Sequence, residues 1–209
     1  MRAVGQVVES LDSERDASIT IGEALTRHYT THGLPPDGGE SAPWFRVHIG
    51  PLVIPLPNPP ARQRAVFFHD VNHVLTGYNT VFSDGEMAIA AFEVGAGCGP
   101  YVVAWYINLC LMALGVLFKP RAVFAAFVLG RSCSSTYERT EDRAELLAKT
   151  VVELKRLVGV DARVVEHPER WRAAFVAWTV VAWLTMLATA ALPIALLWSA
   201  WAIARALIA

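Results

Sequence analysis

The residues of this chain best suited to chemistry lie in the segment His69-Asp70-Val71-Asn72-His73. Two histidines four positions apart in a helix lie on one face, because four residues turn the chain through about 400°. Their imidazole nitrogens can then converge on one metal ion, although a pair of histidines packed in the core has the same spacing. Asp70 could be a further ligand, or it could accept a hydrogen bond from a ligating imidazole and fix its tautomer. The segment predicts a divalent metal site.

Glu86 is the acid best placed to complete this site. It follows His73 by 13 positions, beyond a turn that begins at Gly77, where a returning helix would bring it beside the histidines. The segment Ser83-Asp84-Gly85-Glu86 also matches a capping box, in which a serine hydroxyl and a glutamate carboxylate satisfy backbone N–H groups at a helix start. We favour the ligand over the cap. The predicted metal ligands are His69, Asp70, His73 and Glu86.

Three further charged residues are candidates for binding a substrate. Glu93 is the only charged residue between Glu86 and Lys119, and it lies on nearly the same helical face as Glu86. If Glu93 is buried, it needs a partner or a metal, and the alternative is an exposed glutamate at a helix end. Arg62 and Arg64 could attract an anionic head group, although contact with solvent or lipid phosphate also suits them.

The apolar pattern predicts an all-α domain. The helix that carries the histidines begins at Asn58-Pro59-Pro60, an N-cap residue followed by prolines, and stops at Gly77. Prolines and glycines before it favour an extended connection, in which 47–54 could form a short strand. The apolar segment 101–118 is a central buried helix or one at the membrane surface. The other predicted helices are 18–29, one from near 83, 121–129 and an amphipathic helix over 134–157.

The C-terminal part of the chain is apolar enough to enter a membrane. Positions 173–204 hold no charged side chain, and as one helix they would extend about 48 Å, against a hydrocarbon core of about 30 Å. Pro193 divides the run, so we expect one kinked, tilted span or a span followed by an interfacial piece. The alternative is a buried amphipathic hairpin in a soluble dimer. We therefore predict a helical metal-binding domain, 1–165, and a membrane-anchoring helical segment, 170–209.

Charge and cysteine content narrow the location and the partners. A net charge of −1 gives no sign of nucleic-acid binding. Charged residues among the first 16 positions leave no room for an apolar signal peptide. Three cysteines without a CxxC pattern indicate reduced thiols. Basic residues before the tail predict an inner (cytoplasmic) membrane location with the main domain in the cytoplasm. They are Arg163, His167, Arg170 and Arg172.

The motif His-Asp-Val-Asn-His-Val-Leu-Thr-Gly-Tyr, followed by Gly85-Glu86 and an apolar helix, resembles the ubiquinone (coenzyme Q) biosynthesis protein 4 family. The resemblance covers roughly residues 20–155, and its specific part is 69–93. It implies an all-helical fold, and it gives metal-binding roles to His69, Asp70, His73 and Glu86. Twelve residues separate His73 from Glu86, where the family has eleven, so we expect a displaced glutamate or a bulged loop. The apolar tail also extends beyond the family's common ending and suggests a divergent branch.

The resemblance implies a membrane protein of ubiquinone or prenylated-quinone biosynthesis. Such a protein binds a polyprenylated aromatic precursor and takes part in removing its ring carboxylate and hydroxylating that carbon. The ion would be zinc, with iron as the alternative, because two histidines and a carboxylate suit both. Two other classes stay open: a non-catalytic lipid-binding scaffold that organises other quinone-biosynthesis proteins, and a metallohydrolase with Asp70 as its base. Helices over 87–94 and 101–118 could line a prenyl groove, and a homodimer is a further expectation.

Overall fold

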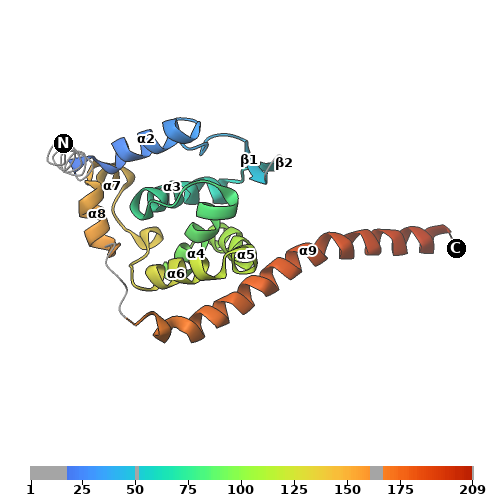
Figure 1. Ribbon diagram of the computed structural model, residues 1–209. Helices are drawn as coiled ribbons and strands as arrows, with labels where there is room; N and C mark the ends of the chain where they lie inside the picture. The colour runs from blue at the N-terminus through green and yellow to red at the C-terminus, as the bar shows by residue number, and fades with distance from the viewer. Residues whose placement is uncertain (1–17, 50–51, 161–166, 209) are drawn as a thin grey trace, which may run out of the picture.

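The computed structural model describes residues 18–49, 52–160 and 167–208, and over these the protein is almost entirely helical (Figure 1). The predicted all-α fold is confirmed. The expectation about a signal peptide concerns residues 1–17, which lie outside the described part, as does Arg163. The α-helices are α2 (Ile21–His32), α3 (Pro60–Thr76), α4 (Met87–Ala96), α5 (Val102–Phe118), α6 (Pro120–Arg131), α7 (Arg143–Ala148), α8 (Val151–Val158) and α9 (Arg172–Ile208).

Helix α4 is the centre of the domain. Every residue from Met87 to Gly95 is buried, and the helix is apolar all round except for Glu93, which is the pattern of a helix surrounded by others. It packs chiefly against α6 and α5, while α3 lies across it and contacts α2, α5 and α8 (Figure 1). A glutamate in the middle of such a helix must find hydrogen-bond partners inside the protein.

Helices α4 and α6 approach each other so closely that their contact requires a glycine. A Cβ atom built on Gly130 of α6 would lie 2.0 Å from the carbonyl oxygen of Phe92 on α4. Because that atom belongs to the backbone, a methyl group fits only if one helix moves.

Helix α3 starts and stops near the predicted residues, but its start uses a different interaction. Its N-cap is Pro59, without a side-chain cap, and Gly77 ends the helix in a left-handed conformation. The prediction that Asn58 caps the helix is wrong. Its amide instead donates to the carbonyl oxygens of three residues in the preceding loop, Gly39, Glu40 and Ala42. Asn58 therefore fixes the extended segment against the start of α3.

The segment predicted as one short strand forms a β-hairpin. Strands β1 (Trp44–Ile49) and β2 (Leu52–Pro57) pair antiparallel, with Trp44 opposite Pro57 and Ile49 opposite Leu52. Prolines disfavour a long strand because they cannot donate to a ladder. In a two-stranded sheet each strand has one free edge, so a proline whose nitrogen faces that edge costs no ladder bond.

The single amphipathic helix predicted over 134–157 is wrong. The structure divides this region into a short 3₁₀ turn, η2 (Thr136–Glu138), and the helices α7 and α8. Asp142 and Thr150 accept hydrogen bonds from the backbone N–H groups of Glu145 and Glu153, so each starts a new helix. These side-chain hydrogen bonds stabilise two separate helix starts, and they outweigh the amphipathic periodicity that favours one continuous helix.

The apolar tail forms one continuous helix, α9, which passes through Pro193 and is not a hairpin. Its first half packs on the domain: Trp178 stacks on Trp105 of α5 with ring centroids 5.1 Å apart, and Thr189 hydrogen-bonds Tyr106 at 3.1 Å. The second half runs away from the domain (Figure 1). By length and composition the segment Pro168–Ala206 could cross a membrane. Helix α5 packs against both α4 and α9, but Val102, Leu117 and Phe118 at its ends are exposed, so 101–118 is a partly buried helix.

Substitution of Gly130 by alanine is expected to destabilise the domain by about 3 kcal/mol or more, because the added methyl group meets backbone. Gly22 of α2 is a matched control, since a Cβ there comes no closer than 3.4 Å to its surroundings. Gly22→Ala should be neutral or stabilising by up to about 1 kcal/mol. Urea unfolding of the two variants measures both effects, and equal stabilities would contradict the tight α4–α6 contact.

Candidate metal centre

Helix α3 presents His69 and His73 on one face, as their spacing predicts. Their Nε2 atoms lie 3.1 Å apart, and the two rings are nearly perpendicular. His73 is buried at 2 % exposure, whereas the His69 side chain keeps 23 % of its surface. His73 is therefore enclosed by the domain, and His69 is partly exposed.

Glu86 completes a group of three. Its carboxylate oxygens lie 3.6 Å from His69 Nε2 and 3.5 Å from His73 Nε2. Among the described residues, these three side chains are the group whose ligand atoms could hold a metal ion. Bonds of about 2.0–2.1 Å to a tetrahedral ion place neighbouring ligand atoms about 3.3 Å apart. The observed separations fit that geometry with little movement.

The alternative role of Glu86, a capping box with Ser83, is wrong. The segment before α4 is a π-helical turn, η1 (Phe82–Glu86), whose N-cap is Val81 and carries no side-chain cap. A π-turn takes in one more residue per turn than an α-turn, and this turn ends at Glu86, beside the histidines. Gly85 makes this possible, because a Cβ there would lie 1.7 Å from the carbonyl oxygen of Asn79.

The far nitrogens of both imidazoles are already bonded. His73 Nδ1 donates to the carbonyl oxygen of Tyr78 at 2.8 Å, and His69 Nδ1 donates to Glu93 Oε1 at 3.1 Å. A carbonyl oxygen can only accept, so the proton of neutral His73 is on Nδ1 and its Nε2 offers a lone pair. Histidines that bind metal have this arrangement, with the second nitrogen tied to a carboxylate or carbonyl.

Glu93 is buried behind His69, and the alternative of an exposed helix-end glutamate is wrong. Its carboxylate accepts four hydrogen bonds: Oε1 from His69 and Asn72, and Oε2 from Asn108 and Tyr137. All four partners donate, so only an ionised carboxylate satisfies them. Burial would raise the pKa of Glu93, but His69 and these hydrogen bonds outweigh burial and lower it. The side chain of Glu93 is fully covered and therefore does not face a substrate.

The structure places Asp70 outside this group. Asp70 Oδ2 accepts a hydrogen bond from the hydroxyl of Tyr29 at 3.0 Å, and its carboxylate does not belong to the three-residue cluster. Burial raises the pKa of Asp70 to about 6, against the opposing effects of His69 and the Tyr29 hydroxyl. Asp70 thus joins α3 to α2 rather than meeting the two Nε2 atoms.

The two candidate arginines lie on different sides of α3. The guanidinium of Arg62 lies 3.8 Å from the ring centroid of Phe45, and the charges of Asp70 and Glu86 both act on it. The guanidinium also donates to Asn58 Oδ1 at 3.1 Å, and Arg62 precedes His69 by seven positions, which places it on the same side of α3 as the histidines. Arg64 precedes His69 by five positions, which places it about 140° around the helix.

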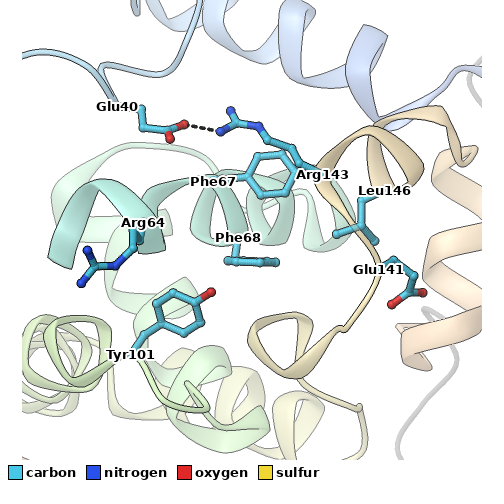
Figure 2. A pocket seen from close by; sticks show the side chains of 8 residues that line it. All are labelled: Glu40, Arg64, Phe67, Phe68, Tyr101, Glu141, Arg143 and Leu146. Atoms are coloured by element: carbon cyan, nitrogen blue, oxygen red, sulfur yellow. Dashed lines mark hydrogen bonds and ion pairs between the residues drawn. The ribbon is translucent and has the colours of Figure 1, made fainter. Parts of the chain in front are cut away.

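Arg64 lines a cavity of about 260 Å³ on that other side of α3. Figure 2 shows Arg143 over the ring of Phe67 and paired with Glu40, while Phe68 and Tyr101 lie below. The cavity is lined by Glu40, Arg64, Phe67, Phe68, Tyr101, Glu141, Arg143 and Leu146. The structure therefore brings Arg62, but not Arg64, toward the histidines.

His28 of α2 is a residue of the site that the sequence interpretation missed. Its ring stacks on His73 with centroids 5.4 Å apart. Its Nε2 is buried and has no hydrogen-bond partner within the described part of the chain. Burial, followed by the neighbouring histidines, lowers the pKa of His28 to about 4, so it is neutral at pH 7. The signal was present, because His28 and His32 are a second pair of histidines four apart.

Removing a ligand should abolish metal binding, while removing the charge of Asp70 should not. His69→Ala and Glu86→Ala are expected to weaken binding of Zn²⁺ at least about a hundredfold, since each deletes one of three ligands. Asp70→Asn keeps an oxygen for the Tyr29 hydroxyl, and its affinity for Zn²⁺ should equal that of the unchanged chain. The zinc content of each variant after dialysis measures these effects. A metal-free Asp70→Asn protein would show that Asp70 is a ligand after all.

Glu93→Gln should destabilise the domain by about 2–4 kcal/mol, because the amide turns a donor toward donors and leaves buried groups unsatisfied. Its affinity for Zn²⁺ should fall about 10–100-fold as the orientation of His69 is lost. Glu138→Gln is the matched control, as Glu138 is exposed and its change should stay within about 0.5 kcal/mol. Chemical denaturation and zinc titration separate the two effects, and a Glu93→Gln protein like the control would contradict them.

Comparison with known proteins adds no match to this geometry. Neither protein-family models, nor curated proteins, nor solved structures match the chain. The resemblance to the ubiquinone biosynthesis protein 4 family therefore stays a prediction from residues 69–93. The geometry itself shows that His69, His73 and Glu86 form a cluster that could hold a metal ion.

Proposed function

We propose that this chain is a membrane-attached, metal-dependent protein of ubiquinone or prenylated-quinone biosynthesis, which acts on a polyprenylated aromatic precursor. The observation that carries the metal site is the pair of Nε2 atoms, 3.1 Å apart and close to Glu86, while the Nδ1 atoms of the same rings are tied to Tyr78 and Glu93. Helix α9 supports attachment to a membrane. The resemblance of residues 69–93 supports the pathway.

The proposed chemistry is an oxidative decarboxylation: the ring carboxylate leaves as carbon dioxide, a hydroxyl group takes its place on that carbon, and dioxygen accepts the two electrons and is reduced to hydrogen peroxide. His69, His73 and Glu86 would hold a divalent ion, zinc or alternatively iron, with one or more positions left for substrate or solvent. When bound, the ion would supply positive charge that stabilises the negative charge left on the ring as carbon dioxide departs. Arg62 would attract the anionic ring substituent, and Glu93 would keep His69 in the ligating tautomer.

The proposed orientation places the helical domain in the cytoplasm, against the inner membrane. Arg170 and Arg172 stand at the start of α9, on the side of the domain, and basic residues near a span favour the cytoplasmic side.

A scaffold is the second candidate, and one observation favours it. The ligands come from α3 and from the junction of η1 with α4, so a bound ion would also link two segments of the fold. The hydrolase is not supported, because Asp70 bonds to Tyr29 instead of facing the cluster.

A genetic test separates enzyme from scaffold. In a host that lacks its own copy, the unchanged chain should restore quinone, whereas His73→Ala should accumulate a carboxylated prenyl-aromatic intermediate, since it lacks a ligand. His167→Ala is the control, because His167 is exposed and its ring pairs with nearby Glu169 on the surface, away from the cluster's ligands. Mass spectrometry of the lipids gives the result. A folded His73→Ala protein that restores quinone fully would contradict catalysis and favour the scaffold.

Metal affinity should fall as the pH is lowered, because protons compete for the Nε2 of His69. Burial lowers the pKa of His69, but Glu93 and Glu86 outweigh burial and raise it well above its usual value. Protonation of His69 stabilises the metal-free fold. This stabilisation is complete below the pKa of His69 in the unfolded chain, about 6.5, and it is lost as the pH rises through the raised pKa of His69 in the folded chain. Zinc affinity should therefore fall as the pH drops below the raised pKa of His69, by up to about tenfold per pH unit for this one proton. A titration against a chelator measures this, and a flat profile would contradict it.

A further inference from the structure

The second half of α9 is long enough to cross the bilayer by itself. Thr189 hydrogen-bonds Tyr106 of the domain, and every side chain described between 190 and 206 is exposed. Residues 190–208 would extend about 28 Å as a helix, close to a hydrocarbon core of about 30 Å. If this half spans the membrane, the domain lies directly against the bilayer surface.

The β-hairpin exposes apolar side chains that the domain does not cover. Trp44, Val53 and Leu56 keep 58 %, 43 % and 39 % of their surface. Outside its own pair, β1 has its main contacts with η1. A two-stranded hairpin is marginally stable in water and gains stability from a further apolar surface.

The position and charge of the hairpin indicate what covers it. In Figure 1 the hairpin and the free half of α9 leave the domain on the same side, while α7 and α8 lie on the other. The hairpin strands hold one full charge, the positive Arg46, which suits anionic lipid head groups. Trp44 has the amphipathic ring typical of membrane interfaces.

We propose that the hairpin Trp44–Pro57 lies in the interface of the membrane that α9 crosses, and that it places the metal cluster beside the lipids. Phe45 of the hairpin contacts Arg62, and β1 contacts the turn that ends in Glu86. A lipid with an anionic aromatic head can therefore reach Arg62 and the cluster from the bilayer, without passing through water. This inference rests on the proposed attachment through α9.

Two fluorescent probes test the proposal in the full-length chain. An environment-sensitive dye is attached to Val53→Cys or to Leu157→Cys, both exposed apolar positions, the second on α8. The unsubstituted chain, labelled in parallel, gives the background from its native cysteines. The proteins are reconstituted in vesicles of equal parts phosphatidylcholine and phosphatidylglycerol, with or without bromine on the acyl chains.

The probe at position 53 should emit at shorter wavelength and be quenched at least about twofold by bromine, because an interfacial segment lies about 5–10 Å into the head-group and acyl boundary. The probe at position 157 should behave as in water. Equal, water-like emission at both positions in chains that stay in the vesicles would overturn the hairpin contact and leave the anchor intact. A blue-shifted probe at 53 without quenching would mean that protein, such as a second copy, covers the hairpin. A chain that does not associate with vesicles would overturn the membrane attachment itself.

Discussion

The buried carboxylate of Glu93 accepts hydrogen bonds from three parts of the chain: α3 through His69 and Asn72, α5 through Asn108, and η2 through Tyr137. A charge this deep is tolerated only because all four partners donate to it. The same contacts join the helices around α4 and set the direction in which His69 Nε2 points. Fold and site therefore depend on one group, and a change at Glu93 cannot affect one without the other.

This arrangement explains why the ligating face can be fixed before an ion binds. His73 is held by the carbonyl of Tyr78 and His69 by Glu93, while Gly85 lets the π-turn bring Glu86 into range. Ligands held in place lose little side-chain entropy when the ion arrives. Without an ion, the carboxylates of Glu86 and Glu93 both lie beside His69 and raise its pKa. A proton on His69 then balances part of their charge, and a metal ion has to displace that proton.

The sequence predicted what depends on local spacing and missed what depends on contacts between distant segments. The pair His69 and His73 follows from helical geometry alone, and the apolar run that became α9 follows from composition. The sequence identified Glu86 as a candidate ligand, but it did not predict the π-helical turn that places Glu86 beside the histidines. The partners of Glu93, such as Tyr137, and the stacking of His28 on His73 come from segments far along the chain. The side chain of Thr150 starts a new helix, α8, although the amphipathic periodicity predicted one continuous helix over 134–157.

The central proposal is that His69, His73 and Glu86 bind a single divalent ion through the two Nε2 atoms and a carboxylate oxygen. X-ray absorption spectroscopy of the zinc-loaded, full-length chain measures the ligands directly. We expect two imidazole nitrogens at about 2.0–2.1 Å and carboxylate or solvent oxygen at about 2.0–2.2 Å. A zinc–sulfur distance of about 2.3 Å, or fewer than two imidazoles, would contradict it.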